Sequence, residues 1–560
     1  MKKLINDPLN VVREMLEGAV ATSPGQALLD RENVVVRDPI PTRAARPVAL
    51  LSGGGSGHEP AHAGYVGEGM LTAAVAGDVF TSPSTDAVLA AIREVAGPAG
   101  AVLIVKNYTG DRLNFGLAGE LARAEGIPVE LVVVADDVAL SGRVEKARSR
   151  GIAGTVLVHK VAGAAAARGL PLAEVAELAR AAAENIGTMG VALGSCTLPA
   201  AGKPNFTLAA DEVELGLGIH GEPGVRKAPL ASADELVQTL LAAIIAQRGL
   251  GRGSRVALLV NGLGSTPPLE LSIVARSALL SLAASGIVVE RAWTGTFLSA
   301  LDMPGVSISL MAVDDSTLHL LDARTEAPAW PGKGKLNPTT VVTMASQSDS
   351  GTIVAKAPGG DVAKILAYAA AEALIAAEDR LTDLDARAGD GDLGASMARA
   401  AQAIRALPET AWNAPSGALA EIGNALRRAI GGSSGPFYAT ALLRASRELG
   451  KGEASPERLA DAFDAAVSAI SELGGAKPGD RTMLDALQPA ADAFRKAIAR
   501  GSPNDALTAA ADAAEKGADN TATMLPGLGR ASYLGDRAVG VPDGGAVAVA
   551  IWLGALANAL

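Results

Sequence analysis

Two patterns of hydrophobic and polar positions divide the chain near residue 325. Up to about Ala323, short runs of β-branched residues alternate with stretches of helical period. This alternation is typical of α/β architecture with largely parallel strand pairing. The predicted strands are Val48–Ser52, Val102–Val105, Val129–Val134, Thr155–His159, Arg255–Val260, Ile287–Ala292 and Val306–Met311.

Helical stretches separate these strands, and a longer one divides the region into two parts. The run Leu230–Gln247 has the length of a closing helix, and Arg255 then begins a second βα series. The pattern therefore indicates two subdomains. The other helices predicted here are Asn114–Glu125, Leu172–Ile186 and Pro268–Ser285.

Beyond Thr325 the residue composition and the hydrophobic pattern change twice. The segment 326–360 is rich in proline, glycine and polar residues and is predicted to be a linker. From 361 to 560 we find helical periodicity and no convincing strand, which predicts an all-helical domain. Its clearest helices are predicted at Val362–Glu378, Ala418–Ile430, Pro456–Glu472 and Arg481–Ala499.

The uncharged run Gly544–Leu560 is the one segment that invites a membrane interpretation. A transmembrane helix needs about 20 apolar residues, and this run is short and contains Asn558. We therefore expect a buried helix, no membrane span and a soluble protein.

Composition excludes two further classes. The chain has 49 Lys and Arg against 60 Asp and Glu, a net charge of −11, and only 3% aromatic residues. It thus lacks the positive charge and stacking rings of a nucleic-acid-binding protein. The single Cys196 excludes an intrachain disulfide framework and a cysteine-rich zinc site. A reducing, cytoplasmic location is expected.

The first candidate site is the glycine-rich segment Ser52–Pro60, directly after a predicted strand. A glycine turn that opens a helix can hold an anion or a polyol against the backbone. It does not fit the dinucleotide fingerprint, because His58 occupies the third glycine position. A plain tight turn is the alternative, although such a turn needs neither His58 nor Glu59.

The second candidate is the segment Lys106–Arg112 at the end of the next strand. Ligands of open α/β sheets bind beyond the carboxyl ends of the strands. Asp111 could therefore act as a general base toward a hydroxyl group. The alternative is that Asp111 caps the following helix.

The third candidate is His220, which lies among the glycines of the segment Gly216–Gly224. Little local packing explains an imidazole there, which suggests a base, a metal ligand or a nucleophile toward a carbonyl. Spacing would allow His58 and His62 to share a metal, but no H-E-x-x-H motif is present. We expect His159 and His319 to be structural.

The fourth candidate, and the strongest, is the acidic segment Asp383–Gly394. Oxygen ligands clustered this tightly suit a hard cation such as Mg²⁺. The EF-hand pattern fails because no Glu occupies its final position. An acidic surface loop is the alternative. Four carboxylates fall within ten positions: Asp383, Asp385, Asp390 and Asp392.

The fifth candidate is the segment Gly431–Pro436, between two predicted helices. Its backbone N–H groups could hold phosphates at the start of a helix. It also matches the G-x-S-x-G pattern of serine hydrolases. That alternative is weak, because no histidine follows His319 in the chain. Nearer the end, Arg530 could stabilise the charge of a transferring phosphoryl group.

Together these segments resemble the single-chain, ATP-dependent dihydroxyacetone kinases over nearly the whole chain. The matching motifs are GGGSGHEPAHAGYVGEGMLTAAVAGDVFTSPS, VKNYTGDRLNFGLA, GLGIHGEPG, AGDGDLG, GGSSGPFY and GRASYLGDR. The resemblance implies an α/β ketose-binding domain of two subdomains over 1–325 and a linker over 326–360. It implies an eight-helix barrel that binds Mg²⁺ and ATP over 361–560.

The resemblance also implies roles for residues of the first domain. His220 matches the histidine that forms a reversible covalent hemiaminal with the substrate carbonyl. Asp111 matches the acceptor of the hydroxyl proton, and His58 matches a hydrogen-bond partner of the substrate. The remaining residues implied to line this pocket are Gly55, Ser56, Gly57 and Lys106.

In the second domain the resemblance implies a metal set and a nucleotide set. Asp385, Asp390 and Asp392 match the carboxylates that hold two Mg²⁺ ions against the phosphates. The implied nucleotide-binding residues are Gly432, Ser433, Ser434, Gly435, Thr482, Met483, Arg530 and Asp543.

The expected activity is transfer of the γ-phosphate of ATP to dihydroxyacetone or a related short sugar such as glyceraldehyde or erythrulose. The alternatives are an erythrulose kinase of tetritol catabolism, an FAD-AMP lyase that forms cyclic FMN, and a non-catalytic sugar-binding regulator. A flexible linker of about 30 residues spans about 30 Å. The helical domain could therefore serve its own chain or a neighbour's, and we expect a homodimer, with exchanged domains as one arrangement.

Overall fold

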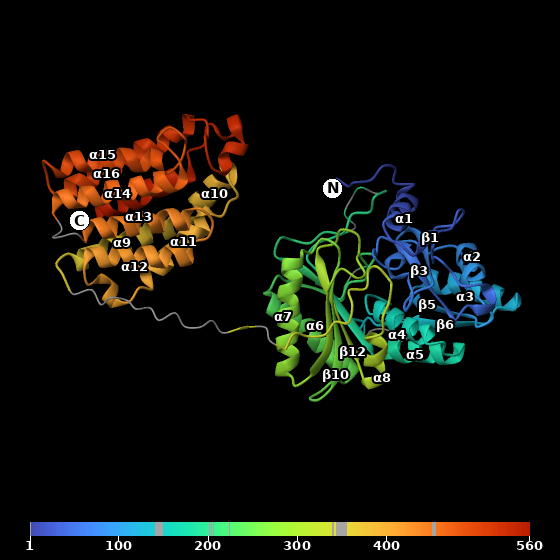
Figure 1. Cartoon of the computed structure of the whole chain (residues 1–560). Coiled ribbons are helices and arrows are strands. Elements are labelled where there is room, and N and C mark those ends of the chain that lie inside the picture. The colour runs from blue at the N-terminus through green and yellow to red at the C-terminus, as the bar shows by residue number, and fades with distance from the viewer. Residues whose placement is uncertain are drawn as a thin grey trace. The chain divides into compact units, whose positions relative to one another are not determined.

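The chain forms two units, Met1–Thr343 and Met344–Leu560, each described by itself (Figure 1). Residues 339–340 and 343–355 of the predicted linker lie outside the described part, so its limits stay a prediction. The computed structural model describes residues 2–140, 149–200, 202, 204, 206–222, 224–338, 341–342, 356–450 and 455–560, with Arg530 described by its backbone alone.

The first unit contains two six-stranded sheets. The first sheet has the order β1-β2-β4-β3-β5-β6, in which β4, β3, β5 and β6 run parallel and β1 and β2 are antiparallel. Its elements are α1 (Val11–Ala21), β1 (Gln26–Leu28), β2 (Val34–Arg37), β3 (Ala49–Ser56), β4 (Ala73–Val79), α2 (Thr85–Val95), β5 (Ala101–Lys106), α3 (Thr109–Ala124) and β6 (Val129–Val134).

The second sheet has the order β11-β10-β12-β7-β8-β9. Only β10 and β11 are parallel among its described pairs, so the prediction of largely parallel pairing is wrong for this half. Its elements are β7 (Ile186–Ala192), β8 (Glu212–Leu215), β9 (Arg226–Pro229), α6 (Ala233–Arg248), β10 (Arg255–Gly262), α7 (Pro268–Ala284), β11 (Val288–Gly295), β12 (Gly305–Ala312) and α8 (Asp315–Leu321). The helices α4 (Thr155–Ala167) and α5 (Leu172–Glu184) precede β7 in the chain and pack against strands of the first sheet.

Strand alternation explains how both sheets are covered. On β10, Ala257 and Leu259 face the central core with α4, whereas Leu258 and Val260 face the core with α6 and α7. On β3, Leu50 faces the central core and Leu51 faces α2 and α3. Helices therefore cover both faces of each sheet, and the central core connects the two subdomains.

The segment Thr155–His159 corrects one strand prediction, because it begins helix α4. Every residue from Thr155 to Ala166 is buried, so this helix shows no polar face from which a helical period could be read. A continuous apolar run cannot distinguish a buried helix from a buried strand by periodicity. The β-branched residues then favoured the wrong element.

The glycine-rich segment also departs from expectation. Gly53, Gly54 and Gly55 are still part of β3, which ends at Ser56. No α-helix opens after it; a short 3₁₀ turn follows at Ala63–Tyr65. The predicted helix N-terminus for an anion is therefore absent here, and the segment presents strand backbone and the loop that follows.

The second unit is helical throughout its described residues. Packing partners follow chain order from α11 to α17, and α17 also packs against α9, which contacts α11. The short helix α10 packs against α11 and α17. The helices are α9 (Gly360–Ala376), α10 (Glu378–Ala388), α11 (Leu393–Arg405), α12 (Pro415–Ala429), α13 (Ser434–Leu449), α14 (Pro456–Gly474), α15 (Leu484–Ile498), α16 (Pro503–Asn520) and α17 (Gly544–Asn558).

The apolar run Gly544–Leu560 forms helix α17, as predicted. Its residues Val547, Val549 and Leu553 are buried in the core of the helical unit. In the described part of the chain, no helix is both long and apolar enough to span a bilayer.

Candidate functional site

The ends of two neighbouring parallel strands bring the first set of candidate residues together. β3 lies between β4 and β5, and His58 follows β3 while Lys106 is the last residue of β5. Asp111 lies in the first turn of α3, and His220 comes from the loop after β8. We call the group His58, Lys106, Asp111 and His220 the histidine pocket.

Aromatic rings enclose the His220 imidazole. Ring centroids of Tyr108, His58 and Phe80 lie 4.7, 4.8 and 5.0 Å from the His220 centroid, all nearly edge-on. The His220 side chain keeps 21% of its surface exposed, so the ring is reachable from outside. The pocket thus holds an imidazole in a fixed place without closing it off.

Glu222 sets the tautomer of His220. The Glu222 carboxylate lies 3.0 Å from Nδ1 of His220 and also accepts the backbone N–H of His220 at 2.9 Å. Because a carboxylate only accepts, Nδ1 carries the proton and Nε2 carries the lone pair. Burial acts to raise the pKa of Glu222, but the hydrogen bonds from His220 outweigh it and lower that pKa.

His58 is fully buried, and only one of its two ring nitrogens has a hydrogen-bond partner among the described residues. Its Nδ1 donates to the carbonyl of Ser299 at 2.8 Å, so its Nε2 is an acceptor. Nε2 is buried without a hydrogen-bond partner among the described residues. Burial, with the neighbouring His220 imidazole and the Lys106 charge, holds the pKa of His58 well below its usual value. The arrangement suits a ligand that brings a hydroxyl donor.

Asp111 is buried and carries two contacts. The Ser82 hydroxyl donates to its Oδ1, and the Lys106 ammonium lies 3.8 Å from its Oδ2. Tyr108, not Asp111, occupies the N-cap of α3. The capping alternative is therefore wrong, and the carboxylate faces the ammonium instead. Burial lowers the pKa of Lys106, with Asp111 opposing that shift.

Glycine is required beside this ion pair. A Cβ on Gly54, whose φ is +152°, would lie 2.4 Å from Lys106 Nζ. A Cβ on Gly55 would lie 2.5 Å from the backbone N of Thr81. The Ser56 hydroxyl donates to the Gly77 carbonyl at 2.7 Å, and the Gly57 N–H donates to Glu59 at 3.0 Å. At Gly54 and Gly55 there is therefore no room for a side chain, and the backbone of this segment lies directly against Lys106 and Thr81.

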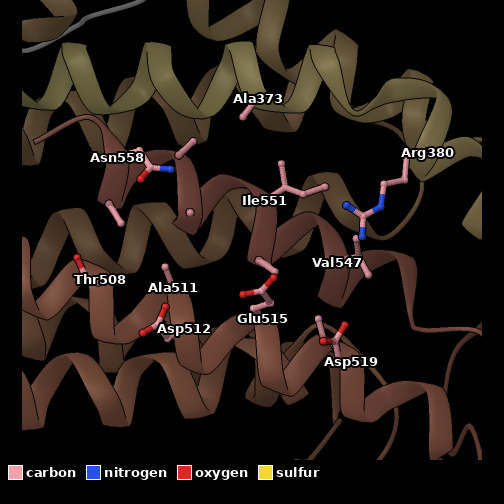
Figure 2. Close-up of a pocket in the computed structure, with 15 residues that line it drawn as sticks. Ala373, Arg380, Thr508, Ala511, Asp512, Glu515, Asp519, Val547, Ile551 and Asn558 are labelled. Atoms are coloured by element: carbon pink, nitrogen blue, oxygen red, sulfur yellow. The ribbon is translucent and has the colours of Figure 1, made fainter.

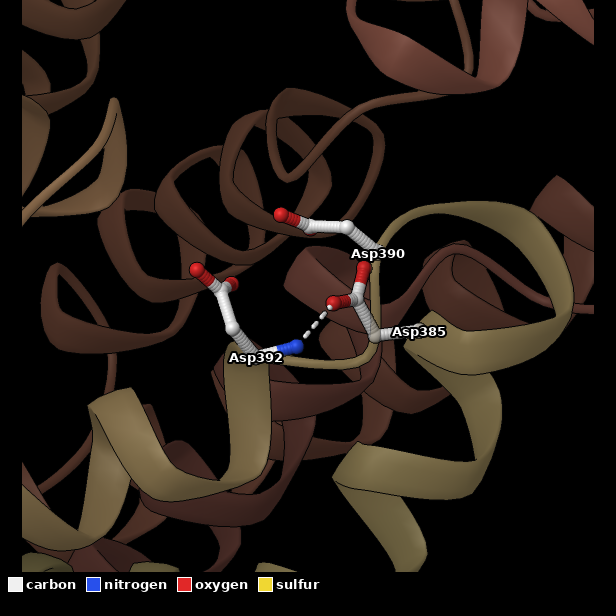
Figure 3. A group of neighbouring side chains, drawn as sticks. All are labelled: Asp385, Asp390 and Asp392. Atoms are coloured by element: carbon white, nitrogen blue, oxygen red, sulfur yellow. Dashed lines mark hydrogen bonds between the residues drawn. The ribbon is translucent and has the colours of Figure 1, made fainter. Parts of the chain in front are cut away.

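The second set of candidates lies in the helical unit. Asp385, near the end of α10, comes together with Asp390 and Asp392 of the following loop (Figure 3). Carboxylate oxygens of the three residues lie within 4.8 Å of one another. Asp385 Oδ2 accepts the backbone N–H groups of Asp392 and Leu393 at 2.9 and 3.2 Å, which fixes the loop. We call these three residues the carboxylate trio.

Asp383, the fourth acid of the motif, is not part of the trio. Its side chain is 72% exposed and lies 3.9 Å from the guanidinium of Arg387, one turn along α10. The surface-loop alternative thus describes Asp383 but not the trio. A single cation could contact all three trio carboxylates, and Mg²⁺ prefers such oxygen ligands.

A cavity of about 360 Å³ opens beside the trio, and we call it the carboxylate cavity. Gly435 does not line it, because this residue packs inside α13 against the carbonyl of Ile430. The side chain of Arg530 lies outside the described residues, although Gly529 and Ala531 line the cavity. The predicted residues that do line it are Asp385, Asp390, Asp392, Gly432, Ser433, Ser434, Thr482, Met483 and Asp543.

A buried arginine and a half-buried aspartate also line the carboxylate cavity. Asp543 accepts the N–H of Ala546 at the start of α17, and burial raises the pKa of Asp543 to about 6, with Arg481 opposing. Arg481 donates to the carbonyls of Ala538 and Val541 at 3.1 and 2.8 Å. This arginine is 1% exposed and ties the loop before α17 to the start of α15.

A second cavity, of about 560 Å³, lies between α9, α16 and α17 (Figure 2). Its walls are alanine-rich, with Asp512, Glu515 and Asp519 along α16 and Arg380 on α10. None of the predicted nucleotide-binding residues lines it. Among the described residues, only the trio brings three carboxylates close enough to share one cation that could offset a polyphosphate's charge, so the carboxylate cavity remains the nucleotide candidate.

The fold and these two sites define a two-domain protein whose parts match known family models. The Dak1 domain model matches residues 17–329, and the DAK2 domain model matches residues 387–558. The chain therefore belongs to the dihydroxyacetone kinase family, as the sequence motifs indicated.

Similar proteins extend over the full chain. The human triokinase/FMN cyclase is 45% identical and covers 100% of this chain and 99% of its own. The D-erythrulose kinase of Mycolicibacterium smegmatis is 36% identical over 98% of this chain and 97% of its own. The solved dihydroxyacetone kinase of C. freundii in complex with AMP-PNP and Mg²⁺ is 37% identical, with a TM-score of 0.64 and full coverage of both chains.

Several pocket residues were not predicted from sequence. Phe80, Ser82 and Tyr108 lie within the quoted motifs but were not singled out, and only the fold shows that they contact His220 or Asp111. Glu222 could have been found, because it follows His220 by two residues and a carboxylate beside an imidazole suggests a pair. Gly54 was hidden among equivalent-looking glycines.

Proposed function

We propose that the protein is an ATP-dependent kinase that transfers the γ-phosphate to a hydroxyl of dihydroxyacetone or a related short ketose or aldose. The observation that carries this proposal is the pairing of two complementary sites in one chain. The histidine pocket has a nucleophilic imidazole beside an unpartnered acceptor, and the carboxylate trio suits a divalent cation.

His220 holds the sugar by its carbonyl group. The lone pair of Nε2 attacks the carbonyl carbon, and the electrons of the C=O π bond move to oxygen, which takes up a proton. The Nδ1 proton leaves through Glu222, so the product is a neutral hemiaminal. His58 Nε2 then accepts a hydroxyl hydrogen of the tethered sugar, which satisfies the buried acceptor.

Asp111 accepts the proton of the hydroxyl that is phosphorylated. Its carboxylate is held by Ser82 and Lys106, so it meets the sugar in a fixed orientation. Lys106 and the close-packed backbone of Gly55, Ser56 and Gly57 complete the pocket. Phosphoryl transfer itself needs little covalent help and depends on such positioning.

The carboxylate trio holds two Mg²⁺ ions, and the carboxylate cavity holds ATP. Mg²⁺ bound here would neutralise the charge of the β- and γ-phosphates and orient them. The backbone of Gly432, Ser433 and Ser434 faces the same space at the start of α13, where N–H groups favour an anion. The remaining proposed nucleotide contacts are Thr482, Met483, Arg530 and Asp543, whereas Gly435, which does not line the cavity, is not among them.

The finer architecture is also a proposal. We infer an eight-helix barrel over 361–560, since α9 and α11 to α17 pack in sequence and α17 returns to α9. We further propose a ketose-binding domain that begins at residue 1 and includes Ala327 and Trp330, whose side chains are buried in the central core, with the linker in the remainder of 326–360. We also propose a cytoplasmic location and a homodimer, with exchanged domains as one arrangement.

Complementation tests the exchanged arrangement. When His220→Ala and Asp390→Asn chains are mixed and refolded or coexpressed, exchange predicts recovery of kinase activity, because one intact pair of sites forms. No recovery in a verified mixed dimer would contradict exchange, and a fully active monomer would contradict the dimer.

The activity is tested by ADP release across a panel of short carbonyl sugars, with and without Mg²⁺. We expect Mg²⁺-dependent turnover with dihydroxyacetone, and side-by-side kcat/KM values for erythrulose and glyceraldehyde will rank the substrates. Glycerol is the control without a carbonyl group. If His220→Ala lowers turnover of dihydroxyacetone and glycerol equally, the tether does not discriminate.

A second activity is favoured by one observation, the 45% identity to a triokinase/FMN cyclase. FAD-AMP lyase chemistry would use the same carboxylate cavity without a sugar. Mn²⁺-dependent breakdown of FAD to cyclic FMN in the absence of sugar would support it. The trio argues against a non-catalytic regulator, because a sugar-binding regulator needs no clustered carboxylates.

A further inference from the structure

A row of buried polar contacts extends from Asp111 into the core and is not used by the proposed mechanism. Lys106 Nζ lies 3.8 Å from Asp111 and 2.9 Å from Nε2 of His62. Nδ1 of His62 in turn lies 3.0 Å from Nε2 of His159 on α4. His62 is 6% exposed, and Lys106 and His159 are fully buried. Polar groups so deep in a core need a reason, because burial is costly unless hydrogen bonds compensate.

The direction of these hydrogen bonds follows from chemistry. An ammonium can only donate, so His62 Nε2 accepts from Lys106. The proton of neutral His62 is then on Nδ1, which donates to His159 Nε2. A weaker contact of 3.4 Å joins the same Nδ1 to the hydroxyl of Ser52. His159 therefore selects the tautomer of His62 that receives the ammonium.

Charge and burial act together on this row. Burial and the Lys106 charge hold the pKa of His62 well below its usual value, and they lower the pKa of His159 to about 3. Both imidazoles are therefore neutral at physiological pH. The titratable groups that face the row are Lys106 from β5, Asp111 from α3, His159 from α4, His58 from the loop after β3, and Tyr65 beside His159.

We propose that His62, held in one tautomer by His159, is a positioning residue that keeps Lys106 protonated and directed at Asp111. The inference rests on the proposed kinase function, in which Asp111 accepts the hydroxyl proton. His62 supplies the only imidazole acceptor for Lys106 among the described residues, and the Gly53 carbonyl, at 3.2 Å, is its other neutral acceptor.

Loss of that acceptor has a definite consequence. A buried ammonium with fewer acceptors releases its proton at lower pH. Lys106 would then lose its charge at a lower pH than in the wild type, and above that pH Asp111 would lose both its charge partner and its orientation. The alkaline limb of the pH profile should therefore move, which a purely structural role of His62 would not cause.

The test compares His62→Leu, His62→Gln and the matched control His319→Leu in the full chain. His319 lies exposed on α8 in the same unit. For His62→Leu we expect the alkaline limb of kcat/KM for dihydroxyacetone to shift down by about one pH unit. His62→Gln keeps an acceptor and should restore most of the wild-type profile, and His319→Leu should leave it unchanged.

The outcomes separate this inference from the proposed function. If folded His62→Leu has the pH profile of the wild type and Asp111→Asn is inactive, the positioning role of His62 is wrong but the proposed kinase mechanism stands. If Asp111→Asn retains full kinase activity, the proposed mechanism itself fails. Equal shifts in His62→Leu and His62→Gln also overturn the inference, because the acceptor would then not matter.

A measurement on the wild-type chain guards against misfolded variants. ¹⁵N NMR of imidazole nitrogens, assigned with the His62→Gln and His159→Gln variants, reports which nitrogen carries the proton. We expect His62 to be protonated at Nδ1 alone and not to titrate between pH 6 and 8. Protonation of His62 at Nε2 would contradict a donor at Lys106 and overturn the proposal.

Discussion

The two candidate sites are built on opposite physical principles. In the histidine pocket, His58, Lys106 and Asp111 are buried, and the fold itself decides where protons and charges lie. In the carboxylate trio, Asp390 and Asp392 are exposed, Asp385 is half-buried, and carboxylate oxygens of the three lie within 4.8 Å of one another. The first site is ordered by burial, whereas the second gathers like charges at the surface of the helical unit.

This difference teaches where each site is vulnerable. A buried site depends on every contact that compensates desolvation, so distant residues such as His159 affect it. An exposed cluster of like charges depends on a cation, so its own ligands dominate. Variants should therefore act locally in the helical unit and through networks in the α/β unit.

The largest effect is expected from the trio. Asp390→Asn should lower Mg²⁺-dependent ADP release by about 10²- to 10³-fold, because a phosphate-bridging cation loses a ligand. Thermal stabilisation by Mg²⁺ with ATP should fall in parallel. Asp383→Asn is the matched control, since Asp383 lies outside the trio. Equal loss in both variants would contradict a specific cation site.

The next effect is expected from Glu222, which holds the His220 tautomer. Glu222→Leu should lower kcat/KM for dihydroxyacetone by about 10²-fold, because Nδ1 loses its charged acceptor and the wrong nitrogen can carry the proton. Glu222→Gln keeps an acceptor and should lose less. Affinity for Mg²⁺ with ATP should not change in either variant, which steady-state kinetics and calorimetry will show.

A third prediction uses pH. The folded pKa of His159 is lowered to about 3, so folding favours the neutral ring. The free energy of unfolding therefore holds its full value above about pH 6.5, the ordinary pKa of the imidazole, and falls as pH drops toward 3. Between pH 7 and 5 this one group lowers the free energy of unfolding by about 2 kcal/mol.

Urea unfolding of wild type and His159→Gln at pH 7 and pH 5 checks this. Between pH 7 and pH 5, the unfolding free energy of the α/β unit should fall by about 2 kcal/mol less in the variant than in the wild type. The helical unit has no histidine and should respond alike in both proteins. An unchanged slope in His159→Gln would show that the ring titrates normally.

The smallest effect is a backbone one. Gly54→Ala places a methyl group 2.4 Å from Lys106 Nζ and should cost about 1–3 kcal/mol of unfolding free energy, with a raised KM for the sugar. Gly116→Ala on α3 meets no atom within 4 Å and should be neutral or stabilising by up to about 1 kcal/mol. Equal stability of the two variants, from denaturant melts, would refute the close approach.

The sequence grouped side chains that the structure brings together, even where it misjudged the elements that carry them. Strand ends followed by polar motifs indicated Lys106 and Asp111, whose charged groups lie 3.8 Å apart, and their roles in a ligand site stay a prediction. The buried α4 was mistaken for a strand, since a helix without a polar face loses its period. His159 was expected to be structural for a different reason. Its hydrogen-bond partner His62 lies 97 positions away in the sequence, so no local pattern connects the two.

The carboxylate trio was predicted almost completely, because its members are close in sequence and glycines allow the turn between them. The spacing alone did not separate Asp383 from the other acids, whereas the family resemblance named the three that converge; Asp383 lies beside Arg387 instead. Likewise Gly435 was grouped with the phosphate loop by adjacency, whereas the first turn of α13 buries it.

One measurement tests the division of labour most directly: ³¹P NMR of phosphate transfer from ATP to dihydroxyacetone by the full chain. Wild type with Mg²⁺ should form the sugar phosphate, as should Asp383→Asn and His319→Leu, while His220→Ala and Asp390→Asn should form almost none. A magnesium-loaded wild type that transfers nothing to any short ketose, or undiminished transfer by both site variants, would contradict the account.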